Sequence, residues 1–181
     1  MTEEEIIKGC IDNNPQCQHA LFRLHAKTMM GICLRYIADT SEAEDILQET
    51  FIKIFKTIGQ FRFEGPLGGW IRRITVRTCL AALHKKHIQY SDISAADLAV
   101  DPNALQAVSV ISEKELTNMI RQLPEGYRIV FNLYVIEGYS HEEIAGMLNI
   151  ETVTSRSQLV KARKLLQRQI SLQQKIIMHN D

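Results

Sequence analysis

The sequence predicts an all-α fold with two small helical domains joined by a flexible acidic linker. Apolar residues recur at helical spacing along most of the chain, and no run of alternating residues is long enough to argue for a sheet. The few glycines and prolines stand at the ends of segments. We place the first domain at residues 1–88, the linker at residues 89–111 and the second domain at residues 112–181. The linker is polar and acidic, contains Pro102 and offers only a weak apolar stripe.

The distribution of charge predicts contact with polyanions. Of the 181 residues, 45% are hydrophobic, which is enough for one large or two small cores. The 21 basic and 21 acidic residues give a formal net charge of zero. The basic residues are nevertheless concentrated in two stretches separated by an acidic one, so we expect two separate surfaces for a polyanion. The first stretch holds Arg62, Arg72, Arg73, Arg77, Lys85 and Lys86, the second runs from Arg156 to Lys175, and the acidic one from Asp92 to Glu125.

The beginning of the chain and its cysteines bear on location and cofactors. The first ten residues are acidic and lack the basic start and apolar run of a signal peptide, and no apolar stretch approaches the length of a membrane span. We therefore expect a cytoplasmic protein without direct membrane insertion. The four cysteines lack CxxC spacing, which favours reduced thiols in the core, and we expect no cofactor. A metal site of Cys10, Cys17, His19 and His25 is the alternative, but its spacing fits no zinc module.

Two helices are expected early in the first domain. One covers residues 20–37, and the next runs from Glu42 to about Ile58 and opens with a capping box of Ser41 and Glu44. The second of these has a wide apolar stripe on one face and, on the other, a surface that we call the acidic strip. The strip is either solvated surface or a docking site for a basic partner helix. The stripe holds Ala43, Ile46, Leu47, Phe51, Ile54, Phe55 and Ile58, and the acidic strip holds Asp45, Gln48, Glu49 and Ile52.

A loop from Phe61 to Gly69, with two aromatic residues and three glycines, leads into a basic helix. Aromatic rings beside cations are what single-stranded nucleic acid requires, because unpaired bases stack on the rings while the cations hold the backbone. The alternative places the aromatic residues in the core. We favour the core for Trp70, which stands at helical spacing with Ile74, and leave both possibilities open for Phe61 and Phe63.

The second domain should begin with two platform helices followed by a helix-turn-helix. Ser112 and Glu115 cap a helix through about Gln122, and Pro124 begins another that ends at Gly138. The next helix starts with a capping box of Ser140 and Glu143, buries Ile144, Ala145 and Leu148, and stops at Asn149, which suits a left-handed helix end.

The last predicted helix follows a tight turn, and Thr152 can cap it. Its inner positions recur at helical spacing, and its outer face is basic, with no acid between Thr152 and Arg168. A helix-turn-helix places such a helix in the major groove of DNA. The alternative is an ordinary surface helix with a solvated basic face. The inner residues are Ser155, Leu159, Ala162 and Leu166, and the outer ones are Val153, Ser157, Val160, Lys161, Lys164 and Arg168, with Arg156 on the flank.

The order of these parts resembles the extracytoplasmic-function (ECF) group of bacterial sigma factors. AEDILQETFIKIF is similar to the family's polymerase-binding helix, and QFRFEGPLGGWIRRI is similar to its promoter-opening loop and helix. LPEGYRIVFNLYVIEGYSHEEIAGMLNIETVTSRSQLVKARKLL is similar to its domain that reads the minus-thirty-five element. Together the three motifs span most of the chain in the family's order.

The resemblance implies a role for each candidate residue. The acidic strip would dock on the clamp helices of the largest polymerase subunit. Phe61, Arg62, Arg73 and Arg77 would bind the minus-ten element and hold a flipped-out base of the non-template strand. Arg156, Ser157, Val160 and Lys161, together with Lys164 of the basic face, would contact the minus-thirty-five element. The family also implies an anti-sigma factor as a partner.

Some residues depart from the family's pattern. Arg77 stands where the family often has asparagine, Ala81 and Ala82 replace an Asp-Tyr pair, and Val153 replaces a glycine, so no known promoter preference is transferred. The leading hypothesis is a promoter-specificity subunit that acts on duplex and single-stranded DNA. A stand-alone helix-turn-helix regulator is the alternative. An enzyme is disfavoured, since we find no nucleophile with its base, no phosphate-binding glycine loop and no inward carboxylate cluster.

Overall fold

The structure, a computed structural model, describes residues 1–85 and 112–178. Within these ranges the chain forms eight α-helices, a 3-10 turn and a short π-helical segment, and no strand, which confirms the all-α prediction. The chain divides into two compact units, residues 1–87 and 88–181, and each is described separately. The predicted linker, residues 89–111, lies outside the described residues.

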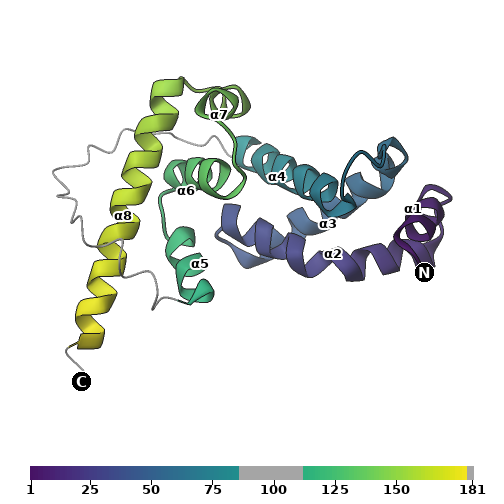
Figure 1. The fold of residues 1–181 in the computed structure, drawn as a ribbon, viewed down its shortest axis with the longest axis horizontal. Helices are drawn as coiled ribbons and strands as arrows, with labels where there is room; N and C mark the ends of the chain where they lie inside the picture. Colours follow the sequence, from purple (N-terminus) through teal and green to yellow (C-terminus); the bar gives the residue numbers. More distant parts are fainter. Residues whose placement is uncertain (86–111, 179–181) are drawn as a thin grey trace. The chain divides into compact units, whose positions relative to one another are not determined.

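In the first unit, α2, α3 and α4 pack against one another along their lengths, and α1 packs on α2 and on the 3-10 turn η1 (Figure 1). The stripe predicted for α3 faces this core: all of its members are buried except Phe55, which is half-buried. The elements are α1 (Glu3–Ile11), α2 (Pro15–Tyr36), α3 (Thr40–Thr57), η1 (Ile58–Gln60) and α4 (Leu67–Lys85).

Two boundaries of the first unit differ from the prediction. The capping box of Ser41 and Glu44 is wrong: α3 begins at Thr40, and Asp39 is its cap, accepting a hydrogen bond of 2.8 Å from the Glu42 backbone N–H. A carboxylate at this position also interacts favourably with the helix dipole. The predicted loop is shorter than expected, because α4 begins at Leu67 and takes two of the three glycines into its first turn. The helix expected over residues 20–37 begins earlier, at Pro15.

All four cysteines are free and buried, as the sequence predicted. Burial raises the pKa of the Cys10 thiol to about 11, with a smaller contribution from Cys17. Among residues 1–85 and 112–178, no cluster of three or more histidine, cysteine or acidic side chains is arranged to hold a metal ion. In the same ranges no helix combines the length and the apolar character needed to cross a membrane.

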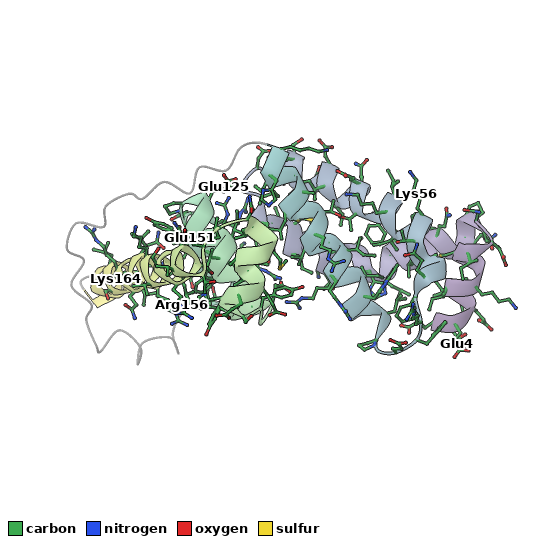
Figure 2. All side chains as sticks on the ribbon, turned by 90° about the horizontal axis from the view of Figure 1, so that it is seen from above. Glu4, Lys56, Glu125, Glu151, Arg156 and Lys164 are labelled. Carbon is green, nitrogen blue, oxygen red and sulfur yellow. The ribbon has the colours of Figure 1, made fainter. Side chains whose placement is uncertain are left out.

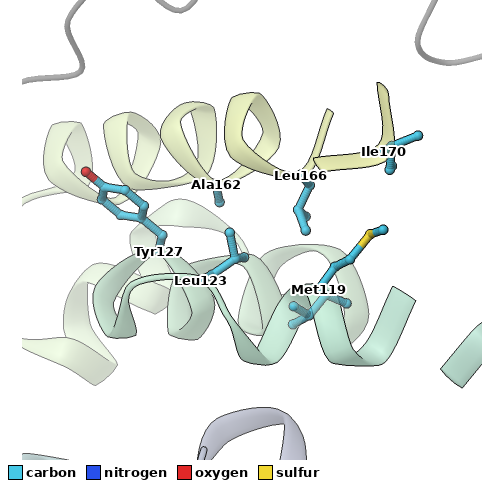
Figure 3. Close-up of a cluster of buried hydrophobic side chains, with 7 residues drawn as sticks. Met119, Leu123, Tyr127, Ala162, Leu166 and Ile170 are labelled. Atoms are coloured by element: carbon cyan, nitrogen blue, oxygen red, sulfur yellow. The ribbon is translucent and has the colours of Figure 1, made fainter. Parts of the chain in front are cut away.

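In the second unit, α8 packs against α5, α6 and α7. Figure 3 shows the core between them, where Met119, Leu123 and Tyr127 face Ala162 and Leu166. Arg128 is buried at the side of this core, and its guanidinium Nη1 donates hydrogen bonds of 2.9 Å to Arg121 O and 3.2 Å to Leu123 O, which satisfies carbonyls at the end of α5. The elements are α5 (Glu113–Arg121), α6 (Glu125–Phe131), the π-helical segment η3 (Asn132–Ile136), α7 (His141–Leu148) and α8 (Thr152–Met178).

The platform helices agree with the prediction in order but not in every boundary. The capping box of Ser112 and Glu115 is present at the start of α5. Pro124 is the N-cap residue of α6 rather than its first residue, and the helix gives way to η3 before Gly138. Gly138 has φ +80°, a conformation that favours glycine and turns the chain toward α7.

Candidate nucleic-acid interfaces

The helix-turn-helix forms as the sequence predicted. Ser140 Oγ accepts a hydrogen bond of 3.2 Å from the Glu143 N–H, and Glu143 Oε2 accepts one of 2.8 Å from the Ser140 N–H. Hydrogen bonds that the carboxyl of Glu143 accepts from the Ser140 N–H and from the Ser140 hydroxyl lower its pKa. Asn149 ends α7 in the left-handed conformation, with φ 52° and ψ 48°. Thr152 is the first residue of α8 rather than its cap, so the turn between the two helices is residues 149–151.

Polar and aromatic contacts join the start of α7 to α8. His141 Nδ1 and the buried Ser155 Oγ share a hydrogen bond of 2.9 Å. The Tyr134 ring stacks on His141 with centroids 4.4 Å apart, and the Arg163 guanidinium lies 5.9 Å from the centre of the Tyr134 ring. Burial and the nearby Arg156 lower the pKa of His141, which favours the neutral imidazole. These contacts fix the angle at which α8 is presented.

The two sides of α8 match the predicted division. Ser155, Leu159, Ala162 and Leu166 are all buried. On the outer face, Val153 is 70% exposed and Val160 is 51% exposed. Arg156 is exposed and its guanidinium lies 3.4 Å from the Glu142 carboxylate, while Ser157, Lys161 and Lys164 are half-buried. Arg156 and Lys164 project from the helix surface in Figure 2. The five candidates for the upstream element therefore lie on one accessible face.

The loop before α4 brings aromatic and basic side chains around one cavity. Phe61 is half-buried, and its ring packs 4.9 Å from Phe63 and 5.7 Å from Trp70, between centroids. Phe63 is 57% exposed and has φ +57°, an uncommon conformation for a bulky residue. The cavity has a volume of about 290 Å³. Its lining is Gln60, Phe61, Arg62, Glu64, Gly65, Pro66, Trp70 and Arg73.

The structure thus unites three of the four minus-ten candidates and corrects one prediction. Phe61, Arg62 and Arg73 line the cavity, whereas Arg77 lies one turn further along α4 and is exposed. Trp70, which its spacing with Ile74 placed in the core, is only half-buried and forms part of the cavity wall. The sequence signal that points to this position is that Trp70 closely follows a segment with two aromatic residues, Phe61 and Phe63.

The acidic strip lies on the exposed side of α3. Asp45, Gln48 and Glu49 are exposed, and Ile52 is 53% exposed. The Lys53 ammonium lies 2.7 Å from the Glu49 carboxylate, and this hydrogen-bonded pair lowers the pKa of Glu49. Such a surface pair contributes little to stability because both groups are solvated. Part of the negative charge of the strip is therefore balanced locally, and the apolar side chain of Ile52 remains accessible beside it.

These features describe a helical protein with two candidate nucleic-acid interfaces, and comparison with known proteins gives its family. Residues 21–87 match the family Sigma-70 region 2, and residues 113–166 match Sigma-70, region 4. The chain is 30% identical to the RNA polymerase sigma-H factor of Pseudomonas aeruginosa over 150 residues, which are 76% of this chain and 78% of that protein. It is 25% identical to the ECF RNA polymerase sigma-E factor of Haemophilus influenzae, over 94% of this chain and 96% of that protein.

A solved structure agrees with the fold. The sigma factor RpoE of Bartonella quintana, in complex with the anti-sigma factor NepR, superimposes with a TM-score of 0.50 at 19% identity, over 83% of this chain and 94% of that chain. The chain belongs to the extracytoplasmic-function subfamily of RNA polymerase sigma factors. Members of this family are non-catalytic regulatory subunits that direct RNA polymerase to specific promoters for transcription initiation.

Proposed function

We propose that the two units divide promoter recognition between duplex and separated DNA. The outer face of α8 binds the minus-thirty-five element as a duplex. The cavity beside the start of α4 holds an unpaired base of the non-template strand at the minus-ten element. The acidic strip of α3 docks on the clamp helices of the largest subunit of RNA polymerase. The chain has no catalytic role of its own and acts in the cytoplasm, where the polymerase works.

The cavity is the observation that carries this proposal. A protein that binds only duplex DNA does not need exposed rings, because paired bases are stacked on one another. Here the Phe61 and Trp70 rings line the cavity with centroids 5.7 Å apart, and Arg62 and Arg73 line it as well. The exposed Phe63 ring packs on Phe61 outside the cavity lining, with centroids 4.9 Å apart. The rings offer stacking partners for an extruded base, and Arg62 and Arg73 offer charge for the phosphates that flank it.

The outer face of α8 supports the upstream contact. The face holds cations and a hydroxyl but no acid between Thr152 and Arg168. Lys161 and Lys164 suit phosphate contacts, and the long side chain of Arg156 suits hydrogen bonds with base edges. The Ser157 hydroxyl, which donates a hydrogen bond of 3.0 Å to Thr154 O, can contact only a base that comes close to the helix. Arg156 would leave Glu142 when it binds DNA, at small cost because the pair is exposed at 62% and 68% of the two side chains.

The acidic strip supports docking on a basic helical partner. Asp45 and Glu49 supply negative charge, Gln48 supplies hydrogen bonds, and Ile52 supplies an apolar contact that is otherwise solvated. An anti-sigma factor is the partner that we propose for regulation, on the grounds of family membership. It would cover the same surfaces and so prevent both polymerase and promoter from binding.

Runoff transcription with core polymerase over a library of promoters tests the proposal. The purified chain should confer selective initiation on a subset of templates. Arg156→Ala should reduce use of the upstream element by about 1–3 kcal/mol if a base contact is lost, and Lys161→Ala should lower the salt slope of binding by about one if a phosphate contact is lost. Selective initiation at no template would reject the proposal. Nanomolar binding to a palindromic duplex without polymerase would instead favour a stand-alone regulator.

A further inference from the structure

Two exposed valines stand in the middle of the basic face of α8. Val153 is 70% exposed and Val160 is 51% exposed. With Ser157 and Lys164 they recur at i, i+4, i+7 and i+11, so all four lie on one stripe of the helix. The stripe points away from the core, because the buried positions of the same helix are Ser155, Leu159 and Ala162.

The helix itself gains little from these valines. A β-branched residue loses rotamer freedom in a helix, and alanine, lysine or glutamine is a better helix former at a solvated position. Single exposed apolar residues are common and need no explanation. Val153 and Val160 are unusual because both lie on the same outward-facing stripe, and the side chains around that stripe are cationic. Arg156 and Lys161 flank the stripe, and Lys164 extends it.

The charge around the valines identifies what covers them. A partner on this face must tolerate several cations and gains from negative charge, since no acid lies between Thr152 and Arg168. It must also present apolar groups to Val153 and Val160. The major groove of duplex DNA offers both, because the phosphates supply the charge and the C5-methyl group of thymine is the apolar feature on a base edge.

We propose that Val153 and Val160 contact thymine methyl groups, so that the upstream element of this protein contains a thymine opposite each valine. This inference rests on the proposed function, in which α8 enters the major groove. It also sets a spacing. Seven residues of helix span about 10.5 Å, and a base pair rises about 3.4 Å. The two thymines, on either strand, should therefore lie within about three base pairs of each other.

Replacement of thymine by uracil tests the contact, since uracil lacks only the methyl group. Holoenzyme reconstituted from the full chain and core polymerase first selects upstream elements from a randomised window in a linear template. Each thymine of the selected element is then changed to uracil, one at a time, and promoter binding and runoff product are measured. We expect a loss of about fourfold at each of two positions, which corresponds to about 0.8 kcal/mol for one methyl-sized group. A penalty at one position only would remove the valine without a matching position from the inference.

Matched variants connect each position to a residue. Val153→Ala and Val160→Ala leave the buried face of α8 intact, and each should remove the uracil penalty at its own position but not at the other. Leu172→Ala is the control, because Leu172 is a 53% exposed apolar residue further along the same helix. It should leave both uracil penalties unchanged. Restoring the methyl group with 5-methylcytosine in a cytosine-substituted element should recover part of the loss at a given position only in proteins that keep the valine assigned to that position.

Three outcomes would overturn the inference while leaving the proposed function in place. They are a selected element without thymine, uracil tolerated at every position, or a uracil penalty that persists in both valine variants. The first two would mean that the valines contact no methyl group, and the third that another residue does. If no template supports selective initiation at all, the proposed function itself fails, and that result appears at the selection step before any uracil is introduced.

Discussion

In the proposed function, Phe61 is the residue whose ring would stack on an unpaired base. Its ring lies between those of Phe63 and Trp70, at centroid distances of 4.9 and 5.7 Å, and it lines the cavity together with Arg62. A leucine at this position would keep an apolar side chain against Trp70 but would remove the aromatic face. The stacking contribution of the ring is therefore separable from its packing contribution.

We predict that Phe61→Leu weakens capture of a base but not assembly with polymerase. In the wild-type holoenzyme, an abasic site at the captured position of a forked promoter should cost about 1–3 kcal/mol of binding, the range for one base stacked on a ring. In Phe61→Leu the same abasic site should cost much less. Fluorescence anisotropy of labelled forked templates measures both. Equal abasic penalties in the two proteins would show that the Phe61 ring does not contact the base.

In the second unit, the side chain of His141 contacts two other elements of the helix-turn-helix region. The His141 imidazole shares a hydrogen bond with Ser155 and stacks on Tyr134, so one side chain at the start of α7 touches α8 and η3. The sequence pattern assigned His141 no role, because a histidine at the first position of a helix has no distinctive spacing. Its contacts depend on how α7 crosses α8, which periodicity does not specify.

At the scale of an element, the start of α3 gives a sharp test of the fold. Asp39→Ala should destabilise the first unit by about 1 kcal/mol, because the Glu42 N–H loses its acceptor and the helix dipole loses a favourable charge. Ser41→Ala is the matched control and should have little effect, since Ser41 lies inside the helix and is exposed. Trp70 is the single tryptophan of the chain, so urea unfolding followed by its fluorescence reports on this unit.

Other relative stabilities of the Asp39→Ala and Ser41→Ala variants would contradict the cap seen in the structure. If Ser41→Ala were the more destabilising change, the helix would begin later in solution, as the sequence pattern alone suggested. If Asp39→Ala cost much less than about 0.5 kcal/mol, the chain would be using Thr40 or Ser41 as a replacement cap. Circular dichroism of both variants would separate these cases, because a later start shortens α3 and lowers the helical signal.

The same element shows what a sequence can and cannot predict. The apolar stripe of α3 and the exposure of the acidic strip were predicted correctly, because burial follows helical periodicity directly. The cap of α3 was predicted wrongly, because Asp39, Thr40 and Ser41 are all acceptable caps. Which of them is used depends on where α2 ends. Since α2 ends at Tyr36, only residues 37–39 connect the two helices, and this short connection sets the start.

The outer face of α8 could be predicted from the sequence better than the cavity, because helical periodicity specifies the faces of a helix but not the path of a loop. The outer face of α8 comes from one helix, so its residues follow from spacing once the inner positions are known. The cavity is formed by a loop and a helix together. Trp70 was assigned to the core from its helical spacing with Ile74. The packing of its ring on Phe61 depends instead on the path of residues 61–66, for which no periodic signal exists.

At the scale of the whole molecule, promoter binding should depend on the polymerase. The formal net charge is zero, so the free chain lacks the long-range attraction that draws a basic protein to DNA. Each unit offers a small surface, and neither the outer face of α8 nor the cavity alone is large enough for tight binding. Docking the acidic strip on polymerase would hold both surfaces near the promoter and raise their effective concentration.

This reasoning predicts a large difference between the free chain and the holoenzyme on the same promoter. The free chain should bind the duplex only weakly, and addition of core polymerase should raise the apparent affinity by about 10²–10⁴, the usual gain from tethering two contacts.

The double variant Asp45→Ala, Gln48→Ala should lose that gain while keeping the helicity and the urea midpoint of the wild-type chain, since both residues are exposed. Lys27→Ala on α2, which is exposed and lies outside the acidic strip, is the control and should assemble normally. A double variant that binds polymerase and promoter as the wild type does would remove the acidic strip from the mechanism, and tight binding by the free chain would show that tethering is unnecessary.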